Sequence, residues 1–220
     1  MTKIIWNHTG KEIEQESFRR IEAETPPECR RRFSDAEWRV ARRLVHTTAD
    51  FTILNDLVFT PGAGEAGVAA LRRGALIYTD SNMIKAGLSI AKLKHFHPAY
   101  ERENILCPVA DPEVAAYAAK HGITRALAAI ELHGEKLDGA IFLCGNAPLA
   151  LAGMVKLHRQ HGVTPALAVA MPVGFVNVIE SKEYLMAAPE IPAIILAGRR
   201  GGSPLAVATL HGIMEPELER

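Results

Sequence analysis

The sequence has no excess charge of either sign, because 25 lysines and arginines balance 25 aspartates and glutamates in 220 residues. Such a chain has no general electrostatic attraction for nucleic acid or for an anionic membrane surface, so the composition supports neither partner. Cysteine is also scarce, with three residues and no close pair. This scarcity disfavours a disulfide framework and a cysteine-based metal site, and it favours a reducing, cytoplasmic compartment.

Long uninterrupted apolar runs are missing as well. Residues 1–14 become polar within a few positions and lack the apolar core of a signal peptide. Residues 162–179 are uncharged and long enough to raise the question of a membrane span. However, Pro165, Pro172 and Gly174 interrupt this segment in the manner of a buried strand, a turn and a second element. We therefore expect a soluble protein with no membrane partner.

Several catalytic signatures are absent. The chain has no GxxxxGK[ST] motif and no GxGxxG after a strand, so phosphate-loop and dinucleotide-binding interpretations lack their fingerprints. It has no G-x-S-x-G nucleophile elbow either, which leaves a hydrolase triad without support. His95 with His97, and His158 with His161, have spacings that metal ligands can adopt, but no carboxylate or cysteine pattern completes either pair. The sequence predicts no metal site.

The most informative stretch that is present is residues 34–50, which reads as a helix with a basic stripe. Ser34 and Glu37 form a capping box, so the helix is expected to begin at about Asp35. One arc of the helix is apolar and is expected to be buried. It consists of Trp38, Val40, Ala41, Leu44, Val45 and Thr48. The opposite arc is basic and, at spacings i, i+3, i+4 and i+7, consists of Arg39, Arg42, Arg43 and His46.

This basic arc is explained either as the solvated side of the helix, which is the commoner case, or as a binding surface. Apart from Asp35 and Glu37, no acidic residue is spaced to pair with it. His46 falls near the C-terminal end of the helix, where the helix dipole favours a protonated imidazole while the neighbouring arginines oppose it. A histidine in that position can both give and accept a proton near neutral pH. The pattern predicts a site for an anionic ligand that needs an acid.

The rest of the chain alternates between apolar runs of strand length and amphipathic runs of helix length. The clearest strands are near-continuously apolar, as in a parallel sheet covered on both faces, and lie at 140–143, 166–170 and 193–196. Weaker strands are expected at 57–59, 75–79 and 105–109. Strand, loop and helix repeated in this way predict a three-layer α/β fold, with a mostly parallel sheet and helices on both faces, preceded by an N-terminal helical segment.

We expect one domain, in which residues 1–50 form the N-terminal helical part and residues 51–215 the α/β sheet part. Its first helix, at 11–24, carries Ser17 in the middle of an apolar face. A hydroxyl there has a simple explanation, a bond back to the carbonyl one turn earlier. The final residues, 215–220, are expected to form a frayed tail.

Ligands of open parallel sheets bind beyond the carboxyl ends of the strands, so the loops at that edge are expected to converge on one crevice. They begin at Asp80, Cys144, Met171 and Ala197, and the helix start at Arg125 is expected nearby. The last loop includes the sequence GRRGGS at 198–203, which could offer backbone N–H groups and two guanidiniums to a phosphate or carboxylate. A flexible turn or a subunit contact explains this loop equally well.

Six segments, taken together, resemble the family of precorrin-8X and cobalt-precorrin-8 methylmutases. They span nearly the whole chain and are ESFRRIEAE at 16–24, RRLVHTTADF at 42–51, TDSNMIKAG at 79–87, GNAPLAL at 145–151, MPVGFVNVIESK at 171–182 and GRRGGS at 198–203. The resemblance implies an isomerase of cobalamin biosynthesis that moves a methyl group between adjacent carbons of ring C of a corrin precursor, giving hydrogenobyrinate or its cobalt counterpart. It also implies a homodimer with pockets near the subunit interface and no added cofactor.

The same resemblance assigns roles to individual residues. His46 falls on the family's histidine, the acid that protonates the macrocycle. Ser17 and Arg43 fall on the serine and arginine that contact the substrate. Asp80 and Arg125 are further candidates to position the macrocycle and its carboxylates. A methyl shift of this kind needs one well-placed acid and a ring held in one tautomer, and general acid help is typically worth about 10²–10⁴-fold.

Two positions depart from the family pattern, since Thr47 stands where many relatives have alanine and Leu149 replaces the threonine of GNAPTAL. Residues 46–50 and the TDSNM loop look more like the cobalt-containing branch. Two other functions remain open: a tetrapyrrole-binding carrier without turnover, and a nucleotide- or phosphate-dependent α/β enzyme using the 198–203 loop. Replacement of His46 would abolish turnover in an enzyme and change nothing in a carrier. Nucleotide binding in the absence of any corrinoid would favour the nucleotide- or phosphate-dependent enzyme.

Overall fold

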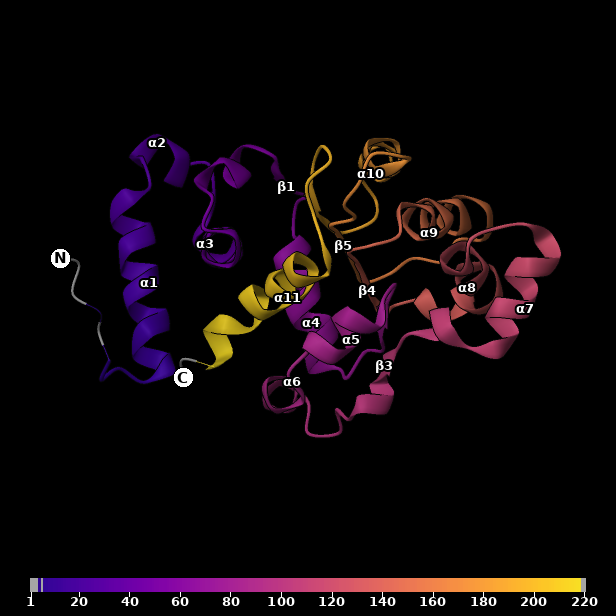
Figure 1. Ribbon diagram of the computed structural model, residues 1–220, viewed down its shortest axis with the longest axis horizontal. Helices are drawn as coiled ribbons and strands as arrows, with labels where there is room; N and C mark the ends of the chain where they lie inside the picture. Colours follow the sequence, from indigo (N-terminus) through magenta and orange to yellow (C-terminus); the bar gives the residue numbers. More distant parts are fainter. Residues whose placement is uncertain (1–3, 5, 219–220) are drawn as a thin grey trace.

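A computed structural model describes residue 4 and residues 6–218 and contains a central six-stranded sheet with helices on both faces (Figure 1). The strands are β1 (Leu57–Phe59), β2 (Ile77–Thr79), β3 (Ile105–Leu106), β4 (Ile141–Cys144), β5 (Leu167–Ala170) and β6 (Ala193–Leu196). They lie in the order β1-β6-β5-β4-β2-β3, with β1 antiparallel to β6 and the other neighbours parallel. The predicted α/β fold with a mostly parallel sheet is confirmed.

The helices divide between the two faces of the sheet. The first face is covered by α3 (Asp35–Thr48), α4 (Ala63–Arg72), α5 (Asn82–Gly87), α6 (Ile90–Phe96) and α11 (Ser203–Leu218). The second is covered by α8 (Arg125–His133), α9 (Pro148–His161) and α10 (Val178–Met186), with α7 (Pro112–His121) against α8. At the N-terminus, α1 (Gly10–Glu24) packs on α3 and is followed by α2 (Pro27–Arg30). Within the described residues, no helix has the length and apolarity needed to cross a membrane.

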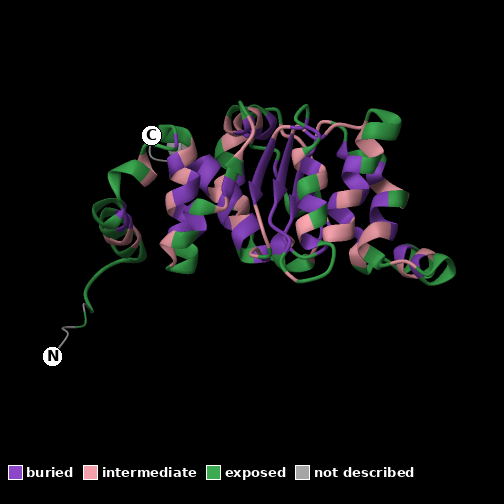
Figure 2. Cartoon of the chain, turned by 90° about the horizontal axis from the view of Figure 1, so that it is seen from above, coloured by how far each residue is buried: buried purple, intermediate pink, exposed green. Residues whose placement is uncertain are grey.

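Strands β4, β5 and β6 are apolar throughout because successive side chains enter different cores. In β4, Ile141 and Leu143 belong to the core beneath α3 and α11, whereas Phe142 and Cys144 belong to the core beneath α9 and α10. Figure 2 shows the strands as a buried layer between two layers of helices. Burial on both faces is the physical reason that these strands read as continuous apolar runs rather than alternating ones.

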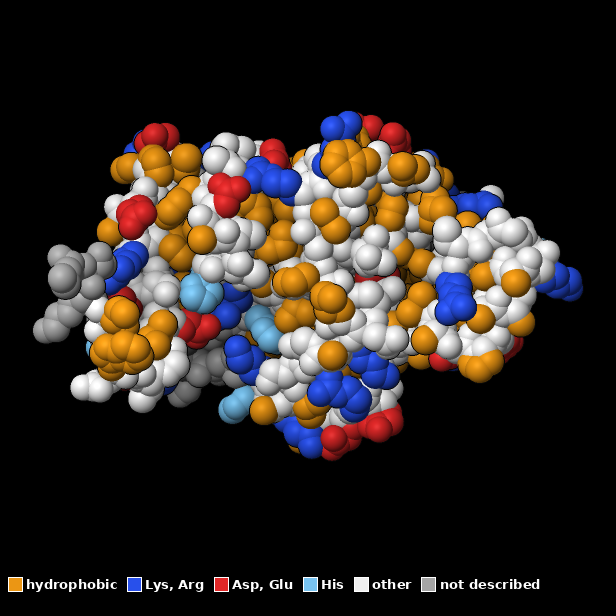
Figure 3. Space-filling view, in the orientation of Figure 1, with side chains coloured by type: hydrophobic (Ala, Val, Ile, Leu, Met, Phe, Trp, Pro, Cys, Tyr) orange, Lys and Arg blue, Asp and Glu red, His pale blue; other side chains and the backbone are white. Residues whose placement is uncertain are grey.

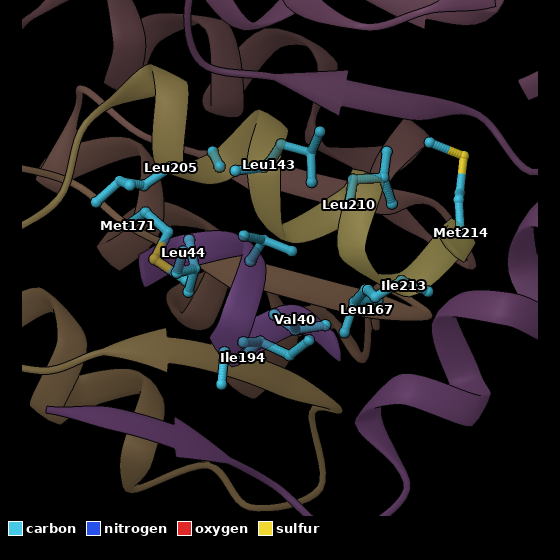
Figure 4. Close-up of a cluster of buried hydrophobic side chains, with 14 of the residues drawn as sticks. Val40, Leu44, Leu143, Leu167, Met171, Ile194, Leu205, Leu210, Ile213 and Met214 are labelled. Atoms are coloured by element: carbon cyan, nitrogen blue, oxygen red, sulfur yellow. The ribbon is translucent and has the colours of Figure 1, made fainter. Parts of the chain in front are cut away.

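The packing of α11 on α3 forms the centre of the first core. Figure 4 shows side chains of both helices gathered over the strands, with labels on Val40, Leu44, Leu143, Leu167, Met171, Ile194, Leu205, Leu210, Ile213 and Met214. The helices approach closely at Gly212, where an added Cβ would lie 2.8 Å from the Cα of Val40. The expected frayed tail at 215–220 is therefore wrong at its start, because α11 continues to Leu218 and Glu215 is only 5% exposed. Residues 219–220 lie outside the described residues.

The predicted helix boundaries hold at α3, which begins at Asp35 with the Ser34–Glu37 capping box formed. Its buried residues match the predicted apolar arc except that Thr48 is exposed and Arg43 is buried. The third strand is shorter than the expected 105–109, since a 3₁₀ turn at Pro108–Ala110 interrupts it and proline has no N–H to offer a ladder. The remaining 3₁₀ turns are η1 (Phe51–Asn55), η2 (Arg102–Asn104) and η4 (Gly134–Leu137).

Candidate functional site

Four loops meet at the carboxyl edge of the parallel strands, as the sequence predicts. The N–H of Gly202 donates to the carbonyl of Met171 at 2.7 Å, which ties the loop after β6 to the loop after β5. The hydroxyls of Ser81 and Ser203 lie 2.8 Å apart and join the loop after β2 to the start of α11. This edge is therefore held together by the loops' own hydrogen bonds.

Asp80 fixes the loop that follows β4. Its carboxylate is 3% exposed and accepts the backbone N–H groups of Gly145 at 3.1 Å, Asn146 at 2.7 Å and Ala147 at 2.6 Å. The thiol of Cys144 lies 3.3 Å from the same carboxylate. Both carboxylate oxygens thus accept hydrogen bonds from the protein, and Asp80 holds the 145–147 loop in shape.

The loop GRRGGS does not present two free guanidiniums, so that expectation is wrong. Arg200 is bound by two carboxylates, with Nη1 2.8 Å from Asp50 and Nη2 2.6 Å from Asp56. These ion pairs join the loop after β6 to the segment just past α3. Arg199 is exposed and lies over the ring of Phe175, 5.4 Å from its centroid.

Lys182 supports the same loop from below. It is 1% exposed and its Nζ donates to the carbonyls of Gly198 and Arg200, at 2.8 Å each. Burial lowers the pKa of Lys182 to about 8, because desolvation disfavours the charged ammonium. The GRRGGS loop is consequently shaped by interior bonds on one side and by ion pairs on the other.

His46 lies near the end of α3, at the wall of an open pocket of about 300 Å³. Its imidazole packs edge-on against Phe18 of α1, with ring centroids 5.4 Å apart. The other residues of the wall are Ser17, Arg20, Ile21, Glu24, Val45, Ala49 and Phe51. The helix ends here because Ala49 turns into the left-handed region with φ of 52°. The ion pair between Asp50 and Arg200 sets this end of α3 at the carboxyl edge of the sheet.

Ser17 shares this pocket with His46, although no sequence spacing relates them. Its hydroxyl donates to the carbonyl of Ile13 at 2.9 Å, which is the simple bond back along the helix that the sequence allowed. A hydroxyl oxygen that donates its proton can still accept a hydrogen bond from another group. Thr47, one of the departures from the family pattern, bonds the carbonyl of Arg43 in the same way at 2.8 Å.

Two residues of the basic face of α3, Arg42 and Arg43, are paired with carboxylates, contrary to the expectation that this face lacks acidic partners. Arg43 is 7% exposed, and its guanidinium lies 2.5 Å from Glu215 of α11 and 3.1 Å from Glu14 of α1. Arg42 contacts Glu215 and Glu22, both at 3.1 Å. The partners are missed in the sequence because they come from other helices, up to 173 positions away.

Two more basic residues reach the same region, and no pattern in the sequence links them to α3. Lys92 of α6 and His211 of α11 lie near enough to Arg43 for its positive charge to matter. Burial, followed by the charge of Arg43, lowers the pKa of Lys92. Burial, with the charges of Lys92 and Arg43, lowers the pKa of His211 to about 4. Figure 3 shows histidine and basic side chains beside acidic ones in the hollow between α1, α3 and α6.

Arg125 is not brought to this region within one chain. It is the exposed first residue of α8, where the hydroxyl of Thr124 accepts the N–H of Leu127 at 3.3 Å. Helix α8 packs on α7 and α9, at the end of the molecule away from α1 and α3 (Figures 1 and 2). The structure therefore groups Ser17, Arg43 and His46 around Phe18, and it separates Arg125 from them.

One histidine of the two pairs that raised the question of a metal has both ring nitrogens bound to other groups. His158 uses one ring nitrogen with Thr164 and the other with Glu190, both at 2.9 Å. Over residue 4 and residues 6–218, no three histidine, cysteine, aspartate or glutamate side chains gather as possible metal ligands.

Known proteins resemble this chain in both sequence and structure. The sequence pattern of the precorrin-8X methylmutase family matches residues 12–216. The chain belongs to this family. It is 38% identical to the cobalt-precorrin-8 methylmutase of Leptospira interrogans, over 93% of each chain, and 37% identical to the precorrin-8X methylmutase of Pseudomonas aeruginosa, over 93% of this chain and 94% of that one. The crystal structure of the Thermus thermophilus precorrin-8X methylmutase superimposes with a TM-score of 0.84 at 44% identity, covering 96% of this chain and 97% of that one.

Membership confirms the resemblance predicted from the six sequence segments. Precorrin-8X methylmutases are isomerases of cobalamin biosynthesis that catalyse a methyl migration. The chain is thus assigned to a family of isomerases that catalyse a methyl migration in cobalamin biosynthesis.

Proposed function

We propose that this chain converts precorrin-8 or its cobalt form by moving a methyl group between adjacent carbons of ring C, giving hydrogenobyrinate or the cobalt counterpart, cobyrinate. The observation that carries the proposal is the setting of His46: an exposed imidazole, packed edge-on against Phe18, at the wall of a pocket of about 300 Å³. Relatives of both names are about equally similar, at 38% and 37% identity. The proposed substrate is therefore the polycarboxylate tetrapyrrole common to both.

In the proposed mechanism, His46 gives a proton to a ring nitrogen of the macrocycle. Protonation draws electron density out of the conjugated system, so the bond from the methyl to one carbon breaks as the bond to its neighbour forms. The nitrogen then returns the proton to His46, and no atom is gained or lost. Such acid help is worth about 10²–10⁴-fold, and the rest of the rate comes from holding the ring in position. The proposed reaction uses no cofactor.

We propose direct substrate contacts for Ser17 and Arg43. Ser17 has an oxygen free to accept a hydrogen bond in the wall beside His46. Arg43 holds Glu14 as its more exposed partner, with 39% of the glutamate side chain accessible, and a substrate carboxylate would compete with that one. Asp80 acts on the substrate only through the 145–147 loop that its carboxylate fixes.

The proposed active form is a homodimer. A volume of 300 Å³ is at the lower end for small-molecule sites, and a tetrapyrrole with carboxylate side chains needs more enclosure than one chain offers. The carboxyl edge also presents unusually exposed apolar side chains, with Phe175 83% and Val176 75% accessible. We place the α8 end of one copy against the α1 and α3 end of the other, so that Arg125 completes the pocket across the interface. The unpaired cysteines support a cytoplasmic location.

The main test is His46→Ala, measured by turnover and by the absorption change when a corrinoid binds. We expect kcat to fall about 10²–10⁴-fold with binding retained, because the proton source is lost while the pocket stays. His161→Ala is the control, since His161 is also exposed in the last turn of a helix. Binding by the wild type without conversion would instead identify a carrier, and normal turnover by the His46 variant would refute the acid.

The dimer is tested by mixing two inactive variants, His46→Ala and Arg125→Ala. If each pocket takes His46 from one subunit and Arg125 from the other, a mixed dimer contains one complete site. Random reassociation of equal amounts makes half of the dimers mixed, so about a quarter of wild-type activity should return. No recovery, in dimers shown to have exchanged subunits, would mean that both residues act within one chain or that Arg125 lies outside the site.

A further inference from the structure

Four helices bring a group of charged side chains together around Arg43, which packs on Phe18 as His46 does. Arg43 comes from α3, Glu14 from α1, Glu215 and His211 from α11, and Lys92 from α6. Ser89, whose hydroxyl caps α6 by accepting the N–H of Lys92 at 3.3 Å, also directs its own N–H toward Nε2 of His211 at 3.5 Å. These contacts fix the start of α6 against α11, so the position of Lys92 is set by the fold.

The charges in this group are not evenly satisfied. Glu215 is shared by Arg42 and Arg43, and Glu14 is bound to Arg43. Lys92 is half-buried, and within the described part of the chain its Nζ makes no hydrogen bond or ion pair. The lowered pKa of His211, about 4, keeps its ring neutral near pH 7, so it adds no positive charge beside Lys92. A partly desolvated ammonium beside a guanidinium costs free energy that an incoming anion would recover.

We propose that Lys92 binds a carboxylate of the tetrapyrrole, as a second anchoring point next to the pocket of His46. The inference rests on the proposed function and adds to it a residue that fixes the orientation of the substrate. Arg43 is already held by two carboxylates, so its guanidinium has a set direction. Lys92 has a flexible stem and an ammonium without an acceptor among the described residues, which suits a carboxylate that arrives with the ligand. Lys92 is a positioning residue, whereas His46 acts on the ring.

The first experiment compares Lys92→Met with wild type in binding hydrogenobyrinate, followed by its absorption spectrum, and in turnover. Loss of a charge-assisted contact should raise Kd and KM about 10- to 100-fold, with kcat changed less than about threefold. Lys94→Met is the matched control, because Lys94 lies on the same helix, is exposed and pairs with Glu101 at 2.5 Å. Its Kd should equal that of the wild type.

The second experiment separates binding from a merely structural role by means of pH and Lys92→Arg. The charged or titratable groups that face Lys92 are Arg43, Glu14, Glu215 and His211. Because burial and Arg43 lower the pKa of Lys92, wild-type affinity should fall at a pH below 10.5, where ordinary lysines are still charged. An arginine stays protonated, so Lys92→Arg should bind tightly through the same range. A lysine that only supports the fold would leave both pH profiles alike.

The outcomes distinguish the two proposals. A wild-type protein that neither binds nor converts a corrinoid overturns the proposed function, and this inference with it. A wild type that turns over while Lys92→Met keeps the same Kd and KM overturns the role of Lys92 alone. If Lys92→Met fails to fold, the comparison of Lys92→Arg with wild type across pH decides the question, and coincident profiles would refute carboxylate binding.

Discussion

At the carboxyl edge of the sheet, Asp80 and Lys182 are buried and bonded to the protein's own groups, whereas His46 and Ser17 line an open pocket near the end of α3. Asp80 accepts three backbone N–H groups at 2.6 to 3.1 Å, and Lys182 donates to two carbonyls. His46 and Ser17 instead line a space of about 300 Å³. Both regions resemble the same family in sequence, but only the side chains near the end of α3 are open to a ligand.

This difference teaches how to assign roles to polar residues in the fold. A carboxylate whose oxygens all accept hydrogen bonds must give up some of them to bind a ligand. Each buried group that is left without its partner costs about 1–3 kcal/mol. An exposed imidazole with one aromatic contact gives up little. Substitutions at the saturated edge should therefore change stability first, and substitutions around His46 should change turnover first.

The largest stability effect is expected for Asp80→Ala. Removing this carboxylate leaves the N–H groups of Gly145, Asn146 and Ala147 without their acceptor, so the free energy of unfolding should fall by roughly 3 to 5 kcal/mol. Urea denaturation measures it. Asp111→Ala is the control, because Asp111 is exposed at the start of α7 and its side chain makes no capping bond there. Equal losses in the two variants would contradict the scaffold role of Asp80.

A somewhat smaller loss is expected for Glu215→Ala, which tests the paired part of the α3 surface. Arg43 and Glu215 have side chains only 9% and 6% accessible, and removing one partner leaves a buried guanidinium with less compensation. Since Glu14 remains on Arg43, we expect about 2 to 4 kcal/mol from the free energy of unfolding. Glu14→Ala should cost less than about 1 kcal/mol, because that glutamate is 39% accessible. Similar values for both would show that burial does not set the strength of these pairs.

Local sequence signals predicted most of the fold because the elements are locally specified. The capping box at Ser34 and Glu37, the apolar strand runs and the glycine stops depend on residues a few positions apart, and these features match the structure. The antiparallel pairing of β1 with β6 was not predicted, since the pairing of Leu57 with Leu196 joins distant parts of the chain. The end of α11 was missed for the same reason: Glu215 is helical and buried because Arg42 and Arg43 bind it.

The site was predictable only in part. His46 and Arg43 share one helix face, so their spacing predicted a common surface. Lys92 gave no signal, since it joins that surface through the packing of α6 on α11. Spacing also could not tell that Arg200 is tied to Asp50 and Asp56. Hydrogen-bond saturation is a property of the folded chain, and it decides which of the predicted polar residues remain available.

The smallest expected effect is a change of stability with pH caused by Lys182, a buried residue whose ammonium is hydrogen-bonded at the carboxyl edge. Burial lowers the pKa of Lys182 to about 8 from the usual 10.5. Between these values the unfolded chain binds more protons at this position than the folded chain, so stability rises with pH. This gain in the free energy of unfolding is complete above about pH 10.5, where Lys182 is neutral in both states, and it is lost as the pH falls through 8. Relative to Lys182→Met, the wild type should gain roughly 1 to 3 kcal/mol in free energy of unfolding across this window.

Urea denaturation at closely spaced pH values measures this difference, with Lys156→Met as the control for an exposed lysine. The control pair should give a flat difference across the same pH range, because the Lys156 side chain is exposed. A flat profile for Lys182 as well would mean that its bonds to the carbonyls of Gly198 and Arg200 stabilise the ammonium enough to cancel the desolvation. In that case a charged Lys182 would hold the carbonyls of the GRRGGS loop throughout this pH range, and its two hydrogen bonds would fully offset the cost of burying the ammonium.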